Sequence, residues 1–235
     1  MRRVLADALS TALRPLCLPL LLLLAVASAP AAASAGDDPG RAKDPEAVVF
    51  EVVTDALERL AADPDTLRED GEAARAFFDE HVLPWVDIRL MARFALGRAA
   101  RQASADELER FTRALERRVA TLYVRALQRY AEEAADFARE GEVILRTVSQ
   151  EDDRAIIAAT LRGPHVEDLS LRVQLYHRDA RWRVFDIETS GVSMLLVFRD
   201  ALRDAARDGG VEAMIAALEQ GSVQVEEAWE AETAD

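Results

Sequence analysis

Two carboxylates stand two residues apart in the run 181–189, where charged and large apolar residues alternate. Such alternation predicts a β-strand, so Asp186 and Glu188 are expected to share one face of it. That face also carries Trp182 and Val184. Paired buried carboxylates can exchange protons with a substrate as acid and base. They can also hold a strand to a neighbouring element, and this structural role is favoured because no histidine or tyrosine is obviously partnered with them.

Other groups that could carry chemistry are sparse. The three histidines, His81, His165 and His177, fall in different predicted elements, and no H-x-x-x-H, C-x-x-C or H-E-x-x-H spacing occurs. Ser193 follows Gly191, but the second glycine of a G-x-S-x-G nucleophile motif is missing. No glycine-rich phosphate loop is present. The sequence therefore predicts no catalytic residue, no metal site and no cofactor.

The chain is strongly acidic. Its 235 residues include 43 Asp and Glu against 29 Lys and Arg, which gives a formal net charge of −14. Phosphate backbones and anionic lipid surfaces repel such a protein. We therefore expect no nucleic-acid partner and no standing adsorption to a membrane. Brief docking to a protein partner stays open.

The N-terminus has the composition of a secretory signal peptide. Basic residues precede an apolar run at 16–26, and small residues follow it. We expect cleavage after Ala33 or Ala35, so residues 1–35 are excluded from the fold. An uncleaved anchor is disfavoured because the apolar run is short for a membrane span. Cleavage also removes Cys17, the only cysteine, and leaves a mature protein that cannot form a disulfide.

Helical patterns follow a flexible leader at 36–43. Helices are expected at about 45–62, 70–82 and 87–96. Ser104 and Glu107 then form a capping box for the longest helix, which Gly141 ends. This helix would be longer than a small domain is wide, so we expect a break near 130–135.

Beyond Gly141 the spacing of the apolar residues changes from the 3.6-residue period of a helix to the two-residue period of a strand. Strands are expected at 143–148, 155–161, 169–176 and from Arg181 to a turn at Gly191, and their short connections predict an antiparallel meander. Helical patterns resume after Gly191, and the acidic residues 221–235 predict a disordered tail. The fold class is α+β, with a four-stranded antiparallel twisted meander of the NTF2-like type packed against a layer of helices. Helices stand both before and after the sheet, in one domain at 44–220.

Four segments of this domain match, in order, the motifs of a known family. They are Val82-Leu83-Pro84-Trp85-Val86-Asp87-Ile88 with Met91-Ala92, Leu96-Gly97-Arg98 with Ala103-Ser104 and Phe111, Thr121-Leu122-Tyr123 with Leu127 and Tyr130, and Arg181 to Ile187 with Gly191-Val192-Ser193 and Phe198-Arg199. On these segments the chain resembles the MlaC family of periplasmic phospholipid-transport proteins, the toluene-tolerance auxiliary component of an ABC transporter. The sequence departs from the family at Ala99-Ala100, where a tryptophan is frequent, and at Arg181, where glycine is usual.

The resemblance implies a monomeric lipid carrier that serves the lipid asymmetry of the outer membrane. Its cargo would be a phospholipid, with the acyl chains between sheet and helices and the headgroup in water. Its partners would be an inner-membrane ABC transporter with a lipid-binding ring and an outer-membrane lipoprotein complex, without stable membrane insertion. Exposing about 30 methylenes at about 0.8 kcal/mol each is costly, so such a carrier must enclose both chains.

The pattern and the implied fold together predict the lining of a lipid pocket. The residues are Met91, Phe94, Phe111, Leu115, Tyr123, Leu127, Leu169, Leu171, Val173, Leu175, Trp182, Phe185, Val197 and Phe198. Two other functions stay open at this point: a small cone-like α+β enzyme with Asp186 as base on an apolar substrate, and a protein-interaction module with a solid core. A long dry cavity favours the carrier, whereas a compact pocket with convergent polar groups favours the enzyme.

Overall fold

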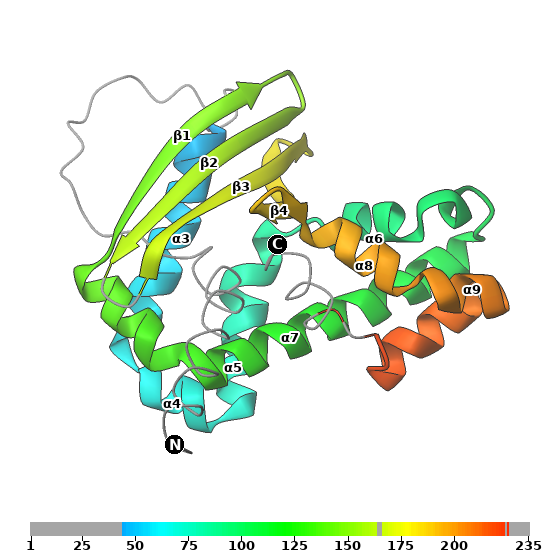
Figure 1. The fold of residues 1–235 in the computed structure, drawn as a ribbon, viewed down its shortest axis with the longest axis horizontal. Coiled ribbons are helices and arrows are strands. Elements are labelled where there is room, and N and C mark those ends of the chain that lie inside the picture. The colour runs from blue at the N-terminus through cyan, green and yellow to red at the C-terminus, as the bar shows by residue number, and fades with distance from the viewer. Residues whose placement is uncertain (1–43, 164–165, 224, 226–235) are drawn as a thin grey trace, which may run out of the picture.

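The computed structural model describes residues 44–163, 166–223 and 225 (Figure 1). The expected signal peptide, the leader and most of the expected tail lie outside the described residues. The helices are α3 (Pro45–Ala62), α4 (Pro64–Glu69), α5 (Gly71–Phe77), α6 (Ile88–Leu96), α7 (Ala105–Glu140), α8 (Met194–Ala201) and α9 (Arg203–Gln220). The strands are β1 (Glu142–Gln150), β2 (Arg154–Gly163), β3 (Val166–Arg178), β4 (Arg181–Thr189) and β5 (Val192–Ser193).

The strands form one antiparallel sheet in the order β1-β2-β3-β4-β5, so each strand pairs with its neighbour in sequence. This confirms the α+β meander and adds β5, a two-residue strand where the sequence predicts the start of a helix. Asp179 and Ala180 join β3 to β4 with φ values of 53° and 59°. Two such residues form the type I′ turn that suits the right-handed twist of a hairpin.

Helix α3 lies across one face of the sheet (Figure 1). The apolar residues buried between them are here called the seam cluster. Its members on α3 and on the end of α7 are Val48, Val49, Val53, Leu57 and Phe137. Its members on the strands are Val143, Ala155, Ile157, Ala159, Leu161, Leu171, Val173, Leu175 and Trp182. The sheet alternates as expected, with these residues inward and residues such as Arg172 exposed on the other face.

Helix α7 is the axis on which the other helices pack. It begins with the predicted capping box, in which Ser104 Oγ accepts from Glu107 N at 3.2 Å and Glu107 Oε2 accepts from Ser104 N at 2.8 Å. Tyr130 has a φ of −128°, which breaks the helix at the expected position. Its C-terminal half packs on α3, α4 and α5 in a second cluster, the α7 cluster, which includes Ala56, Leu60, Leu67, Phe77, Phe78, Tyr123 and Leu127.

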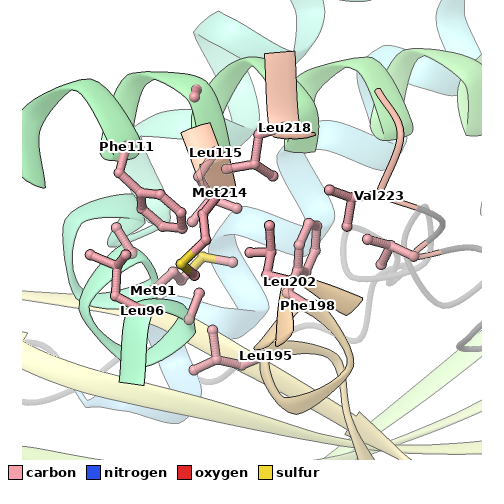
Figure 2. Packing of buried hydrophobic residues seen from close by; sticks show 14 of the residues in the cluster. Met91, Leu96, Phe111, Leu115, Leu195, Phe198, Leu202, Met214, Leu218 and Val223 are labelled. Carbon is pink, nitrogen blue, oxygen red and sulfur yellow. The ribbon is translucent and has the colours of Figure 1, made fainter. Parts of the chain in front are cut away.

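The N-terminal half of α7 packs on α6, α8 and α9 in a third cluster, the distal cluster (Figure 2). Its members include Met91, Leu96, Phe111, Leu115, Leu195, Phe198, Leu202, Met214, Leu218 and Val223. Val223 and Val225 are buried in it, so this part of the expected tail is packed. Gly209 and Gly210 have non-helical dihedral angles and kink α9.

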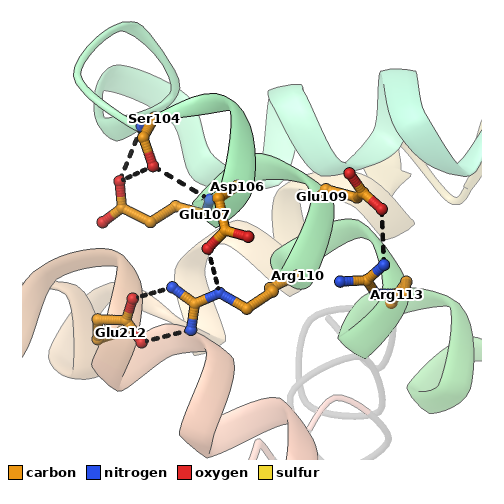
Figure 3. Close-up of polar contacts among 7 residues, drawn as sticks. All are labelled: Ser104, Asp106, Glu107, Glu109, Arg110, Arg113 and Glu212. Atoms are coloured by element: carbon orange, nitrogen blue, oxygen red, sulfur yellow. Dashed lines mark hydrogen bonds and ion pairs between the residues drawn. The ribbon is translucent and has the colours of Figure 1, made fainter.

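Ion pairs on the surface connect α7 with α9 (Figure 3). Arg110 binds Asp106 one turn earlier in α7 and both carboxylate oxygens of Glu212 in α9. The Glu212 carboxylate raises the pKa of Arg110, and Arg110 in turn lowers the pKa of Glu212. Because these side chains are exposed, the pairs orient the two helices more than they stabilise the fold.

Candidate functional site

Helix α3 turns a row of valines towards the sheet. Asp44 caps the helix by accepting a hydrogen bond from Glu46 N at 3.1 Å, and Pro45 occupies the first turn. Residues three and four positions apart lie on the same side of a helix, and this spacing relates Val48, Val49, Val52 and Val53. Their β-branched side chains have few rotamers, so they present a stiff apolar ridge.

A small cavity remains between this ridge and the sheet. Its other wall is formed by Trp85, Leu175, Trp182 and Val184. The described side chains expose only apolar atoms to it, and its volume is about 10 Å³. That is roughly the volume that admits one water molecule, whereas sites for drug-sized ligands measure about 300–1,000 Å³. The contact between α3 and the sheet, here called the seam, is therefore apolar and leaves little free space.

One polar contact, here called the clasp, fastens the first turn of α3 to the edge strand β1. Glu46 Oε2 accepts hydrogen bonds from Thr147 N at 2.8 Å and from Thr147 Oγ1 at 2.6 Å. The pairing of β1 with β2 shifts between Thr147 and Ser149, and a β-bulge of this kind interrupts the ladder of the strand. The clasp thus joins a helix terminus to an irregular point of the sheet edge.

Asp87 positions Trp85, the residue of the second cavity wall that does not belong to the sheet. Its backbone N–H donates to Val184 O at 2.8 Å, which places the neighbouring Trp85 against β4. Asp87 Oδ1 caps α6 by accepting from Leu90 N at 2.9 Å, and Oδ2 accepts from Arg178 Nη2 at 2.9 Å. The Asp87 carboxylate is buried, so the cap and the ion pair compensate its loss of hydration.

A β-bulge in β4 decides which residues face the seam. The pairing of β3 with β4 shifts by one residue at Phe185. Val184 before the bulge and Ile187 after it both pack on the seam cluster. Asp186 is therefore directed to the opposite face, and the prediction that it shares the face of Trp182 and Val184 is wrong. An extra residue in one strand reverses the alternation on which that prediction depends.

Asp186 braces the corner between β4 and α8. Its Oδ1 accepts from the backbone N–H groups of Ile187 at 2.9 Å and Leu195 at 3.0 Å. Its Oδ2 accepts from Ser193 Oγ at 2.6 Å and Gln174 Nε2 at 3.1 Å. Burial raises the pKa of this carboxyl, although the Ser193 hydroxyl and the backbone amides lower it. Both carboxylate oxygens are used in hydrogen bonds that hold the fold, and they face away from the cavity. Asp186 is therefore placed for a structural role and not for the role of a general base.

The residues predicted to line one pocket lie in three different places. At the seam are Leu169, Leu171, Val173, Leu175 and Trp182. In or against the distal cluster are Met91, Phe111, Leu115, Phe185, Val197 and Phe198, and in the α7 cluster are Tyr123 and Leu127. Phe94 is 45% exposed and stacks on Phe185. As lipid contacts they stay predictions, and of the fourteen only Leu175 and Trp182 line the cavity.

Sequence reasoning missed the other residues of the cavity. The ridge valines of α3, Trp85 and Val184 are absent from the predicted lining. The valine row at 48–53 was the available signal, because its spacing marks one buried helix face. Local periodicity does not say which helix that face meets. In the part of the chain that the structure describes, no three His, Cys, Asp or Glu residues form a group suited to a metal ion.

This architecture defines an α+β protein built around an apolar seam between a meander sheet and a helix. No helix among the described elements is long and apolar enough to cross a membrane. A family model described as "MlaC protein" matches residues 51–220, and the chain belongs to the MlaC family. The family resemblance seen in the sequence motifs is thereby confirmed.

A solved structure shares the fold. It is that of the phospholipid-binding protein from Ralstonia solanacearum in complex with a phospholipid. The two chains are 20% identical, the match covers 82% of this chain and 99% of the other, and the TM-score is 0.63. At this identity the likeness establishes a common arrangement of sheet and helices.

Proposed function

We propose that this protein binds a phospholipid and encloses its acyl chains between α3 and the sheet. The observation that carries the proposal is the apolar seam, whose cavity exposes no polar atom of the described side chains. Membership of the MlaC family and the phospholipid complex of the Ralstonia solanacearum protein support it. Acyl chains offer only apolar surface, so a seam of this kind suits them and selects little between headgroups.

Loading requires α3 to move away from the sheet. A cavity of about 10 Å³ is far too small for two acyl chains. Burial of about 30 methylenes at about 0.8 kcal/mol each contributes over 20 kcal/mol. Separating the valine ridge from the sheet costs about 1.5–3 kcal/mol for each side chain that is fully uncovered, and the incoming lipid covers the same surface again. The balance therefore favours an open, loaded state in which the clasp between Glu46 and Thr147 is broken.

The same energetics favour transport by docking. Release of the lipid into water would forfeit the burial of both chains, so transfer has to occur on a partner. We propose a periplasmic, monomeric shuttle that exchanges lipid with an inner-membrane ABC transporter and its lipid-binding ring, and with an outer-membrane lipoprotein complex. The protein enters the periplasm behind a cleaved signal peptide and performs no catalysis.

Native mass spectrometry of the gently purified protein tests lipid binding at the seam. Val52 lines the cavity and is half-buried, so Val52→Glu places a charge in the seam without filling the core. Val124→Glu is the matched control, because Val124 is half-buried on α7 and packs against the α7 cluster. We expect phospholipid on the wild type and on the control, and at least tenfold less on Val52→Glu. A wild type without lipid would refute the function, and full lipid content of Val52→Glu would refute the site.

A further inference from the structure

We propose that the exposed side of α6 and the turn after it dock an acidic surface of a partner protein. This α6 patch consists of Arg89, Arg93, Phe94, Arg98 and Arg101, with Phe185 beneath Phe94. It lies outside the seam and makes no use of the lipid contacts proposed above. It therefore adds a binding surface to the protein and does not restate the lipid site.

The patch is a positive region on a negative protein. Residues 88–105 contain four arginines and no Asp or Glu, in a chain of net charge −14. Among residues 44–163, 166–223 and 225, no guanidinium group of these four arginines makes a hydrogen bond or an ion pair. Several arginines on the other helices are paired, as in Arg59 with Asp55 and Arg75 with Asp79. The four free guanidinium groups thus have no role in holding the fold.

The patch also has an exposed apolar residue. Phe94 is 45% exposed although it lies on a helix with a well-buried opposite face. Its ring stacks on Phe185, with ring centroids 5.6 Å apart and an interplanar angle of 15°. The stack holds Phe94 in place, so little side-chain entropy is lost when a partner covers it. An exposed aromatic residue and arginines on the same side of a protein have the composition that is enriched in the energetic centres of protein interfaces.

The charge distribution favours a protein partner over a membrane. An anionic bilayer is a continuous negative surface, so it would face the acidic remainder of this chain as well as the patch. A partner protein can confine its carboxylates to the contact area, where arginines bind them through two parallel hydrogen bonds. Repulsion everywhere else then fixes the orientation of docking.

The position of the patch suits a partner that exchanges lipid. Phe185 is next in sequence to Val184, which lines the cavity of the seam. A protein that covers Phe94 and Phe185 therefore contacts the strand that forms one wall of the cavity. The partner we infer carries an apolar pocket for Phe94 and a rim of Asp and Glu for the arginines.

The test is site-specific photo-crosslinking of the full chain in the cells that produce it. The crosslinker p-benzoylphenylalanine replaces Phe94 and, as a control, Phe50, which is 42% exposed on α3 outside the patch. We expect a protein adduct at position 94 that is at least tenfold stronger than at position 50. The crosslinked partner peptide should contain Asp or Glu, and Arg89→Glu with Arg93→Glu should reduce the adduct at least tenfold. Reversing those partner carboxylates to arginine should restore it.

Two results would overturn the proposal. One is an adduct at position 94 no stronger than at position 50, or a partner peptide without acidic residues. The other is binding to vesicles of 70% phosphatidylcholine and 30% phosphatidylglycerol that Arg89→Glu with Arg93→Glu abolishes, which would assign the patch to a membrane surface. Co-purified lipid is measured on every variant. Because the patch lies outside the seam, unchanged lipid content separates a failure of docking from a failure of the lipid site.

Discussion

Val184 and Phe185 are consecutive residues of β4, yet their side chains belong to different parts of the molecule. Val184 lines the cavity of the seam, whereas Phe185 packs on the distal cluster and stacks on Phe94. Consecutive residues of a strand point to opposite faces of the sheet, and the β-bulge at Phe185 keeps Asp186 on the same side as Phe185. One strand therefore forms a wall of the candidate site and also supports α6.

The clasp should control how fast the seam opens. Glu46→Ala removes the acceptor of two hydrogen bonds from Thr147. Hydrogen bonds to a charged group contribute about 1.5–3 kcal/mol when buried, and these are only half-buried, so we expect a loss of about 1–2 kcal/mol in unfolding free energy. If opening of α3 limits loading, uptake of a fluorescent phospholipid should become several-fold faster. Stopped-flow fluorescence measures the rate, and Glu58→Ala, at an exposed position of the same helix, is the control. Uptake that slows or stays unchanged would show that α3 does not gate the site.

Much of the fold could be predicted because it follows from local rules. Ser104 and Glu107 form the capping box that their spacing indicates, and Tyr130 lies at the expected break. The alternation in β3 predicted a half-buried strand correctly. In each case the deciding contacts are made within a few residues, so the sequence contains them directly.

The candidate site was harder to predict because its contacts are non-local. Four residues of α7 were expected to line the pocket with the sheet, but Phe111 and Leu115 pack in the distal cluster and Tyr123 and Leu127 in the α7 cluster. The shorter α3 covers the sheet with its valines. The bulge at Phe185 had no signal in the sequence, because an extra residue in a strand is defined only by its partner strand.

Asp87 should contribute to stability through two separable contacts. Asp87→Asn removes the charge of the ion pair with Arg178 but keeps an oxygen that can accept from Leu90 N. Asp87→Ala removes both. A helix N-cap contributes about 1 kcal/mol, so urea unfolding should find Asp87→Ala less stable than Asp87→Asn by about that amount. Equal stabilities of the two variants would mean that the cap contributes nothing.

Replacing Tyr123 with phenylalanine should make the protein more stable. Its side chain is buried, and its hydroxyl has no hydrogen-bond partner among the described residues. Burial raises the pKa of this phenol, which is the signature of a hydroxyl without polar surroundings. An unsatisfied buried polar group costs about 1–3 kcal/mol, so Tyr123→Phe should raise the unfolding free energy by about 1–2 kcal/mol.

Tyr176→Phe is the control for this prediction. The Tyr176 hydroxyl hydrogen-bonds Asp153, whose carboxylate raises the pKa of the phenol. Removing a satisfied, half-buried hydroxyl should leave the unfolding free energy unchanged or slightly lower. If Tyr123→Phe destabilises the protein as well, the Tyr123 hydroxyl has a partner in solution, such as an enclosed water.

Asp186 should make stability fall as the pH rises through its titration. Burial raises the pKa of Asp186 above its ordinary 3.8, so the folded state holds this proton more tightly than the unfolded state. The contribution of the group is therefore largest below pH 3.8 and decreases as the pH rises through the raised pKa. The Asn side chain of Asp186→Asn does not titrate, so the unfolding free energy of this variant should rise relative to that of the wild type between pH 4 and 7.

Glu107→Gln is the comparison variant. The Ser104 hydroxyl and amide lower the pKa of Glu107 and stabilise its charged form at neutral pH, so the unfolding free energy of Glu107→Gln should fall relative to that of the wild type as the pH rises. Urea unfolding at several pH values compares the two variants, and differences that change with the same sign would mean that the hydrogen bonds to Asp186 outweigh its burial.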